Sequence, residues 1–353
     1  MTDLQPYLQL AVTKKASDLY FSANAPAMIR VEGEMSPITR TPLPAGTVQD
    51  LIHGILTPEQ REELERHREV DFALSASGLG RFRVNAFYQR GFVSMVMRYV
   101  PSEVPRLNDL GVPTVLKDFA LLKRGLVLLV GPTGCGKSTT LAAMIRHRNE
   151  TQSGHILSVE DPIEYVHPNV RALISQREVG LDTESYERAL VSAMREAPDV
   201  VYLGEIRRRQ TMERCMQLAN TGHLVLSTLH ANNASQAMQR IVNFFPGDQR
   251  DQLYLDLSLT LRAVVSQRLV LGLEKRRVAA SEILINTPYI AELILSHRIE
   301  DIPAAMAQGQ DHRMQTFEDS LYALYKTGAI SKENALTYAD SRSSLEARIS
   351  FGS

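Results

Sequence analysis

The chain has 353 residues, with 39 basic and 40 acidic side chains and a net charge of −1, a length that favours two domains and an ample core. The balanced charge argues against a nucleic-acid or anionic-membrane partner. Two cysteines are too few for a disulfide framework or a four-cysteine zinc site, the N-terminus lacks signal-peptide features, and no apolar run approaches about 20 residues. We therefore expect a cytoplasmic protein without a membrane span.

The first hundred residues have the composition of a small α+β domain. Its predicted helices and strands alternate in short pieces, and the last two strands are close enough in sequence to form a hairpin. We expect helices over residues 4–15, 48–55 and 58–67, and strands over residues 18–21, 28–32, 70–74, 80–89 and 92–99.

Side chains alternate along the strand predicted from residue 80. Phe82 and Val84 fall on one face, whereas Arg81, Arg83 and Asn85 fall on the other. On this pattern alone, the arginines are interpreted most simply as a solvated strand face.

A turn-rich connector follows at residues 101–106. Beyond it, short continuous apolar runs alternate with helical stripes, which is typical of a mostly parallel sheet whose strands are covered on both faces. The runs lie at residues 126–130, 156–159, 200–203 and 224–226. We therefore predict an N-terminal domain over residues 1–100, a linker over 101–112, and an α/β domain over 113–353 with C-terminal helices from about residue 289.

Three stretches of the second domain are predicted to be helical. The stripe over residues 186–194 ends before Pro198, and a second stripe covers residues 212–219. We expect the methionines of these stripes, and Cys215, to fill the core. Residues 248–268 fit both a strand and a helical face, and their length favours a helix.

The run at residues 126–130 leads into the phosphate-loop pattern G-x-x-x-x-G-K-[ST], with a helix-compatible segment after it. The glycines let backbone N–H groups turn toward phosphate oxygens, and the following helix offers its positive end to the same anion. The lysine of this pattern reaches the β- and γ-phosphates, and the serine hydroxyl can ligate Mg²⁺. We predict nucleoside triphosphate binding at Gly131, Pro132, Thr133, Gly134, Cys135, Gly136, Lys137, Ser138 and Thr139.

Acidic residues follow two of the predicted strands, where the ligands of such sheets lie. A cluster at residues 160–164 follows the run at 156–159, and Glu205 follows the run at 200–203. Hydrolysis needs a carboxylate to hold the water shell of the metal, and another, or the same one, to deprotonate the attacking water. These acids are candidates for both tasks, and helix caps or solvated loops are the alternative.

His223 and His230 lie seven residues apart, at either end of the predicted strand 224–226. Together with Ser227 and Thr228 they suit a sensor that hydrogen-bonds phosphate or water, and a structural role is equally open. Neither cysteine accompanies them at the spacing of zinc ligands.

Together these stretches resemble the secretion and type IV pilus ATPase superfamily. The resemblance covers nearly the whole chain and rests on the phosphate loop, the aspartate box (159–164), the Walker B segment (203–207) and the histidine box (222–230). The short N-terminal domain and the absence of a tetracysteine zinc module are similar to the pilus retraction ATPases.

Within the retraction ATPases, residues 232–237, 241–246 and 314–317 resemble the PilU branch. Residues 289–294 depart from the Ala-Ile-Arg-Asn-Leu-Ile segment of the PilT branch, and Arg208 stands where the family usually has aspartate.

The resemblance implies a RecA-like ATPase domain, a PAS-like N-terminal domain, and nucleotide bound between them. It implies that Arg83 and Arg98, with Arg81 as a further candidate, act on the phosphates, which suits the charge that develops in the transition state. It suggests Glu164 as the base that activates water and Glu205 as the acid of the Mg²⁺ shell, and either carboxylate fits either task. His230 joins these catalytic candidates through the histidine box, and Ser138 joins Glu205 as a metal contact.

The function that this resemblance implies is that of a homo-hexameric ATPase of the type IV pilus, which drives or assists pilus retraction in twitching motility. Its implied cofactors are ATP and Mg²⁺, and its implied partners are a PilT-like retraction ATPase and the platform protein of the inner membrane, at whose pilus base it would be peripheral. The alternative is an accessory ring component that binds ATP and acts mainly by docking on PilT. A RecA-like nucleic-acid motor is disfavoured by the balanced charge.

Overall fold

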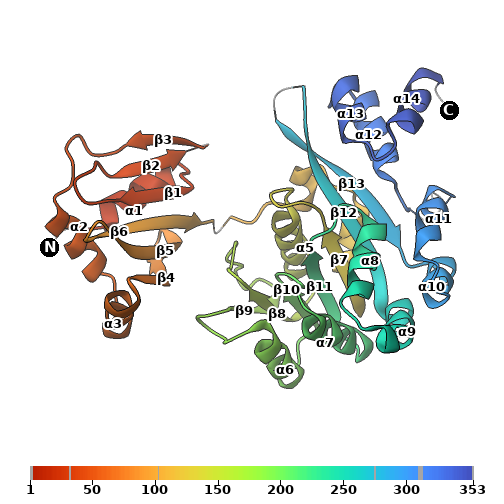
Figure 1. Cartoon of the computed structure of the whole chain (residues 1–353), viewed down its shortest axis with the longest axis horizontal. Helices are drawn as coiled ribbons and strands as arrows, with labels where there is room; N and C mark the ends of the chain where they lie inside the picture. The colour runs from red at the N-terminus through yellow and green to blue at the C-terminus, as the bar shows by residue number, and fades with distance from the viewer. Residues whose placement is uncertain (1–2, 32, 102, 274–275, 309–312, 352–353) are drawn as a thin grey trace. The chain divides into compact units, whose positions relative to one another are not determined.

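The computed structural model describes residues 3–31, 33–101, 103–273, 276–308 and 313–351. The chain forms two compact units, Met1–Glu103 with Glu164–Val166, and Val104–Ile163 with His167–Ser353. Each unit has its own sheet and its own buried core (Figure 1).

The first unit is built on an antiparallel sheet with strand order β3-β2-β1-β6-β5-β4. Its strands and helices lie close to the predicted positions, except β3, whose exposed and polar residues gave no strand pattern. The elements are α1 (Gln5–Thr13), β1 (Asp18–Phe21), β2 (Met28–Val31), β3 (Glu34–Pro37), α2 (Ala45–His53), α3 (Pro58–His67), β4 (Glu69–Ala76), β5 (Gly80–Gln89) and β6 (Phe92–Val100).

The predicted alternation along β5 is confirmed. Phe82 and Val84 are buried in the core of the first unit, whereas Arg81, Arg83 and Asn85 are only half-buried on the opposite face. The hairpin of β5 and β6 is also confirmed, and it pairs the two strands over their full length.

The second unit is an α/β fold around a sheet of order β13-β12-β7-β11-β10-β8-β9, which is parallel except for the pair of β12 and β13. The predicted mostly parallel sheet is therefore confirmed. The strands are β7 (Gly125–Val130), β8 (Gly154–Glu160), β9 (Ala172–Glu178), β10 (Val200–Leu203), β11 (Leu224–Leu229), β12 (Leu261–Leu271) and β13 (Arg277–Ile285).

Helices cover both faces of this sheet (Figure 1). Leu126, Leu128 and Val130 of β7 pack into a cluster with the middle helices of the unit, and the alternate residues Val127 and Leu129 pack into a second cluster with α4 and α5. This two-sided burial, worth about 1.5–3 kcal/mol per side chain, explains why the strand is apolar at every position. The helices are α4 (Val115–Ala120), α5 (Lys137–Thr151), α6 (Tyr186–Glu196), α7 (Arg209–Asn220), α8 (Ala234–Asn243), α9 (Arg250–Thr260) and α10 (Pro288–Leu295), with 3-10 turns η1 (Leu107–Leu110) and η2 (Gly247–Gln249).

The prediction of one helix over residues 248–268 is wrong. Helix α9 ends at Thr260, where the Asn286 side chain donates to the Ser258 and Leu261 carbonyl oxygens, and β12 begins directly at Leu261. Two elements without a connecting loop merge into one apolar pattern, so periodicity could not separate them.

The prediction that Met194 fills the core is also wrong, because its side chain is 51% exposed. Ala193, the residue before it, is fully buried in the core, so the buried face of α6 includes Ala193 and leaves Met194 outside. Met212, Met216 and Cys215 do lie in the core as predicted, and burial raises the pKa of the Cys215 thiol to about 12.

The C-terminal helices, predicted from about residue 289, pack beside the β12–β13 pair. Phe317 and Leu321 of α12 share a cluster with Val270 of β12 and Ala280 of β13. None of the described helices is both long enough and apolar enough to cross a membrane. The elements are η3 (Ile299–Asp301), α11 (Ile302–Gln308), α12 (Phe317–Lys326), α13 (Lys332–Tyr338) and α14 (Arg342–Phe351).

Candidate active site at the phosphate loop

The phosphate loop joins the end of β7 to the first turn of α5. Gly131 has φ +152° and Gly136 has φ +90°. A Cβ atom at Gly131 would lie 2.4 Å from the Gln267 carbonyl oxygen, and one at Gly136 would lie 2.9 Å from Gln267 Nε2. Only glycine fits either position, because the backbone conformation is left-handed and β12 leaves no space for a side chain.

Lys137 begins α5, and its buried side chain turns back over the loop. Its Nζ donates to the carbonyl oxygens of Gly131 at 2.8 Å and Pro132 at 2.9 Å. The residues that follow it, Ser138 and Thr139, are half-buried hydroxyls, and the first turn of the helix carries no acid that would offset its positive end. This end of α5 is therefore suited to a polyphosphate.

Glu205 and His230 meet at the same edge of the sheet as the loop. They follow β10 and β11, which run parallel to each other and to β7, with Leu229 paired to Val130. The Glu205 carboxylate is 14% exposed, and its Oε1 lies 3.1 Å from His230 Nε2. A cavity of about 510 Å³ is lined by His230 together with Gly131, Pro132 and Thr133. A histidine and a carboxylate thus stand beside the predicted phosphate site.

The loop after β10 is held in place by bonds to β11 and by Arg207. Thr228 Oγ1 donates to the Gly204 carbonyl oxygen at 2.7 Å, and the Ile206 N–H donates to the Thr228 carbonyl oxygen at 2.9 Å. Arg207 Nε donates to Glu205 Oε2 at 2.8 Å, and this bond raises the pKa of the guanidinium. The carboxylate is consequently fixed from both sides.

His223 does not join this group. It precedes β11 at the amino end of the strand, where Leu224 pairs with Gly125 at the start of β7. Its Nδ1 lies 3.0 Å from the Leu218 carbonyl oxygen and 3.2 Å from Thr221 Oγ1. The interpretation of both histidines as one sensor is therefore wrong for His223, which closes the end of α7.

The acidic cluster after β8 divides between the two units. Glu160 is buried, and it accepts hydrogen bonds from Ser158 Oγ at 2.8 Å and Gln176 Nε2 at 3.2 Å. Burial raises the pKa of the nearby Tyr186 hydroxyl, and the charge of Asp161 raises it further. Glu164 belongs to the first unit, so its predicted role as a base stays a prediction.

Arg83 and Arg98 lie directly opposite each other on β5 and β6 of the first unit. Arg98 Nε donates to Oδ1 of the buried Asp18 at 2.9 Å, and Ser17 Oγ donates to the other oxygen of that carboxylate at 2.8 Å. Among the described residues, Arg83 has no ion-pair partner of its own. The same face carries Arg81 and Asp71, whose carboxylate accepts from Asn85 Nδ2 at 3.0 Å, so its arginines outnumber its carboxylates. The predicted action of Arg83 and Arg98 on phosphates stays a prediction.

Sequence reasoning missed Gln267, which touches the loop most closely. Its side chain is buried and bonds both the Cys135 carbonyl oxygen and the Thr140 hydroxyl. Gln267 is the one side-chain amide in Leu261–Leu271, but the polar residues Ser266 and Arg268 on either side of it give it no distinct signal.

Known proteins resemble this chain along nearly its whole length. Residues 1–344 match the family described as type II/IV secretion system protein. The chain is 47% identical to the type IV pilus ATPase PilU of Pseudomonas aeruginosa, over 99% of this chain and 92% of that protein, and 42% identical to the type IV pilus retraction ATPase PilT of the same organism, over 94% and 97%. The crystal structure of the pilus retraction motor PilT with bound ADP superposes with a TM-score of 0.91 at 39% identity, over 98% of this chain and 99% of that one.

Proposed function

Because this chain belongs to the type II/IV secretion system protein family, we propose that it is an ATPase of the type IV pilus that drives or assists pilus retraction. The observation that carries this proposal is the meeting of the phosphate loop, Glu205 and His230 at one edge of the sheet. Its similarity to PilU and PilT, along nearly the whole chain, supports the same function.

The nucleotide-binding residues of the proposal are Gly131 to Thr139. The N–H groups of the loop and the start of α5 hold the phosphates of ATP, and Lys137 neutralises part of their charge. The Ser138 hydroxyl and the Glu205 carboxylate are oxygen donors of the kind that Mg²⁺ prefers, and they would hold it with Glu205 acting through water. When bound, the ion would supply positive charge to the phosphates.

Glu205 and Glu164 are the proposed acid and base of hydrolysis. Glu205 is held by Arg207 and His230, which supports a fixed role in the metal shell. Glu164 then takes the proton of the attacking water, although either carboxylate has the chemistry for either task. His230 orients Glu205 and the water beside it.

Arg83 and Arg98 are the proposed cationic groups that act on the phosphates, and both belong to the N-terminal domain. We place this domain at residues 1–100, the linker at 101–112 and the ATPase domain at 113–353. Guanidinium groups stabilise the charge that develops on the γ-phosphoryl group during transfer. The unbalanced positive charge of this pair supports the assignment, since a strand face with only a structural role gains nothing from adjacent cations.

The working form in this proposal is a homo-hexameric ring in the cytoplasm, peripheral to the inner membrane at the pilus base. There it would act with a PilT-like retraction ATPase on the platform protein of the pilus. Release of the γ-phosphate would remove the attraction that draws the arginines toward the phosphate loop, and so would couple hydrolysis to domain movement.

The test is the ATPase rate of the purified full chain. Lys137→Ala and Glu205→Ala are expected to reduce turnover to background, since each removes a charge that the reaction needs. Lys123→Ala is the matched control, because Lys123 is an exposed lysine of the same unit that lies before β7. Wild-type rates in both site variants would refute the proposal.

An accessory role is the second candidate function, and it is motivated by the departure of residues 289–294 from the Ala-Ile-Arg-Asn-Leu-Ile segment of the PilT branch. Here the chain binds ATP and acts mainly by docking on a PilT-like ATPase. Cells that carry Lys137→Ala beside an intact PilT distinguish the two. Full retraction would favour docking, and loss of retraction would favour catalysis by this chain.

A further inference from the structure

Strand β12 continues past the end of β7 and runs beside the phosphate loop. Ser266 is the last residue of β12 that pairs with β7, and its partner there is Val130. Gln267 follows Ser266 and lies beyond this pairing. The Gln267 side chain is 3% exposed, its Nε2 donates to the Cys135 carbonyl oxygen at 2.8 Å, and its Oε1 accepts from Thr140 Oγ1 at 2.9 Å. One amide therefore joins the loop to the first turn of α5.

The bond to Cys135 has a direct effect on the next N–H group. In a trans peptide the carbonyl oxygen and the following N–H point in opposite directions. Because Gln267 fixes the Cys135 carbonyl oxygen toward β12, it turns the Gly136 N–H away from β12 and into the loop. That N–H is one of the groups that a phosphate loop offers to its anion.

The chemistry at this position suits only a neutral amide. The Cys135 carbonyl oxygen requires a hydrogen-bond donor, whereas the Thr140 hydroxyl here requires an acceptor. The amide of glutamine offers both. A glutamate would turn a carboxylate oxygen toward the Cys135 carbonyl oxygen and place a negative charge beside the phosphates. An apolar side chain would leave two buried polar groups without partners.

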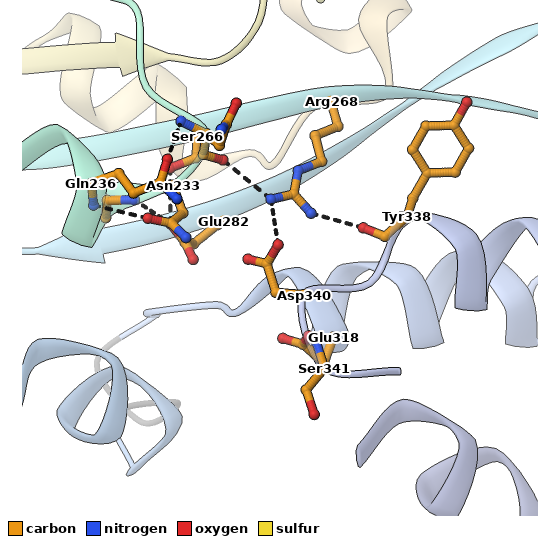
Figure 2. Close-up of polar contacts among 11 residues, drawn as sticks. Asn233, Gln236, Ser266, Arg268, Glu282, Glu318, Tyr338, Asp340 and Ser341 are labelled. Carbon is orange, nitrogen blue, oxygen red and sulfur yellow. Dashed lines mark hydrogen bonds and ion pairs between the residues drawn. The ribbon is translucent and has the colours of Figure 1, made fainter. Parts of the chain in front are cut away.

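The neighbouring residues anchor the strand on its other face, since side chains alternate along it (Figure 2). The Arg268 guanidinium donates to the carbonyl oxygens of Tyr338 at 2.7 Å and Asn232 at 3.2 Å, and pairs with Asp340 Oδ1 at 2.6 Å. The central carbon of the Arg268 guanidinium, Cζ, lies 3.8 Å from the centre of the Phe317 ring.

A second anchor lies beside the first. Ser266 Oγ donates to Glu282 Oε1 at 2.9 Å, and the Ala234 N–H at the start of α8 donates to the same oxygen at 2.7 Å. With both anchors in place, β12 is tied to α8 and to the C-terminal helices, and it presents Gln267 to the loop from a fixed position.

We propose that Gln267 is a positioning residue, which holds the phosphate loop in the conformation that binds nucleotide. The inference rests on the proposed function, because it concerns the same nucleotide site. It assigns Gln267 no contact with the nucleotide and no part in the transfer of protons.

The experiment measures the dissociation constant for ADP, with fluorescently labelled ADP and the full chain. Gln267→Met is expected to weaken binding at least tenfold, and Gln267→Glu to weaken it further because of its charge. Thr140→Val, which keeps the bond to Cys135, is expected to stay within about threefold of the wild type. Gln267→Asn, whose shorter amide cannot reach both partners, replaces Gln267→Met if that variant does not fold, and a tenfold loss is expected there too.

Val270→Ala is the stability control, since Val270 is buried on the same strand and packs against the C-terminal helices. It is expected to lower the melting temperature without a change in ADP affinity. Binding by Gln267→Met within twofold of the wild type would overturn the inference, as would an equal loss of affinity in Val270→Ala. If the wild-type chain bound no ADP, the proposed function would fall as well, so the two failures are distinguishable.

Discussion

His230 Nε2 lies 3.1 Å from Glu205 Oε1, across the tips of two adjacent parallel strands. The other oxygen of the same carboxylate accepts from Arg207 Nε at 2.8 Å. One acid is thus held by an imidazole and a guanidinium, at the edge of the sheet where the phosphate loop also begins. The orientation of this carboxylate depends on residues that need not touch the nucleotide.

Replacement of His230 is expected to lower activity through Glu205. His230→Ala removes one of the two groups that orient the carboxylate, and the loss of such a supporting partner typically reduces activity by about 10- to 100-fold. The ATPase rate of the purified chain measures this. His223→Ala is the matched control, because it lies at the opposite end of β11 and closes α7. It is expected to cost about 1 kcal/mol of stability with kcat unchanged, and equal effects of the two substitutions on kcat would contradict the assignment.

Arg83→Ala is expected to lower kcat by about 10³-fold or more, the size of effect seen for arginines that stabilise phosphoryl transfer. The free energy of unfolding of this variant should stay the same or rise slightly, because like charges opposite each other on a sheet cost about 0.2–1 kcal/mol. Asn85→Ala, on the same face of the same strand, is the control for ATPase rate and melting temperature. A fall of less than tenfold would make Arg83 a structural residue.

Arg98→Ala is expected to behave differently from Arg83→Ala. Arg98 is the partner of Asp18, which is 4% exposed, so its removal leaves a buried carboxylate without its cation. We expect a loss of about 1–3 kcal/mol in the free energy of unfolding, measured by urea titration. Arg98→Lys keeps the charge and should recover part of that loss, and unchanged stability in Arg98→Ala would contradict the importance of the pair.

Arg208→Asp is expected to stabilise the chain. Arg208 is the N-cap residue of α7 and makes no side-chain cap bond, whereas aspartate there can accept the free N–H groups of the first turn. The expected gain is about 0.5–2 kcal/mol, read as a higher melting temperature. Arg214→Asp makes the same charge change inside the helix and should give no such gain. The arginine at this position thus leaves α7 without a side-chain cap.

His167 should make the chain less stable in acid. Burial lowers its pKa from 6.5 to about 4, and its Nδ1 has no hydrogen-bond partner within the part of the chain that the structure describes. The folded chain binds the neutral ring more favourably than the charged one. The contribution of His167 to the free energy of unfolding is therefore complete above pH 6.5 and is lost as the pH falls from 6.5 to about 4. The free energy of unfolding is expected to fall by about 3 kcal/mol over this pH range.

His167→Leu is expected to flatten that part of the pH profile, as measured by urea unfolding of the full chain across this range. His67→Leu, at an exposed position, should leave the profile as in the wild type. Parallel profiles for the wild type and His167→Leu would show that His167 is not the group responsible.

Four strands of the second sheet, β7, β8, β10 and β11, were predictable because burial covers both of their faces. Residues 126–130 are apolar throughout because helices pack on both faces of β7, and β10 is likewise buried at every position. Edge strands carry a weaker signal. In β9, at the end of the sheet, Leu173 is 57% exposed and the middle of the strand is only half-buried, so its residues show no pattern that predicts a strand.

The site was predictable where one short motif carries it and was not where the fold assembles it. Lys137 and the loop glycines follow from local sequence, and Glu205 follows from its place after a strand. Gln267 comes from a strand distant in sequence, and its role depends on the parallel pairing of β12 with β7. Periodicity cannot reveal that pairing.

The order of strands in the first unit decides how it bears mechanical load. Its last strand, β6, lies between β1 and β5, and it pairs with both in antiparallel register. A pull on the chain beyond Val100 runs along β6, and therefore stresses the hydrogen bonds on both of its sides together, in shear. A pull along an edge strand would load a single row of hydrogen bonds, so attachment through β6 divides the same force between two rows.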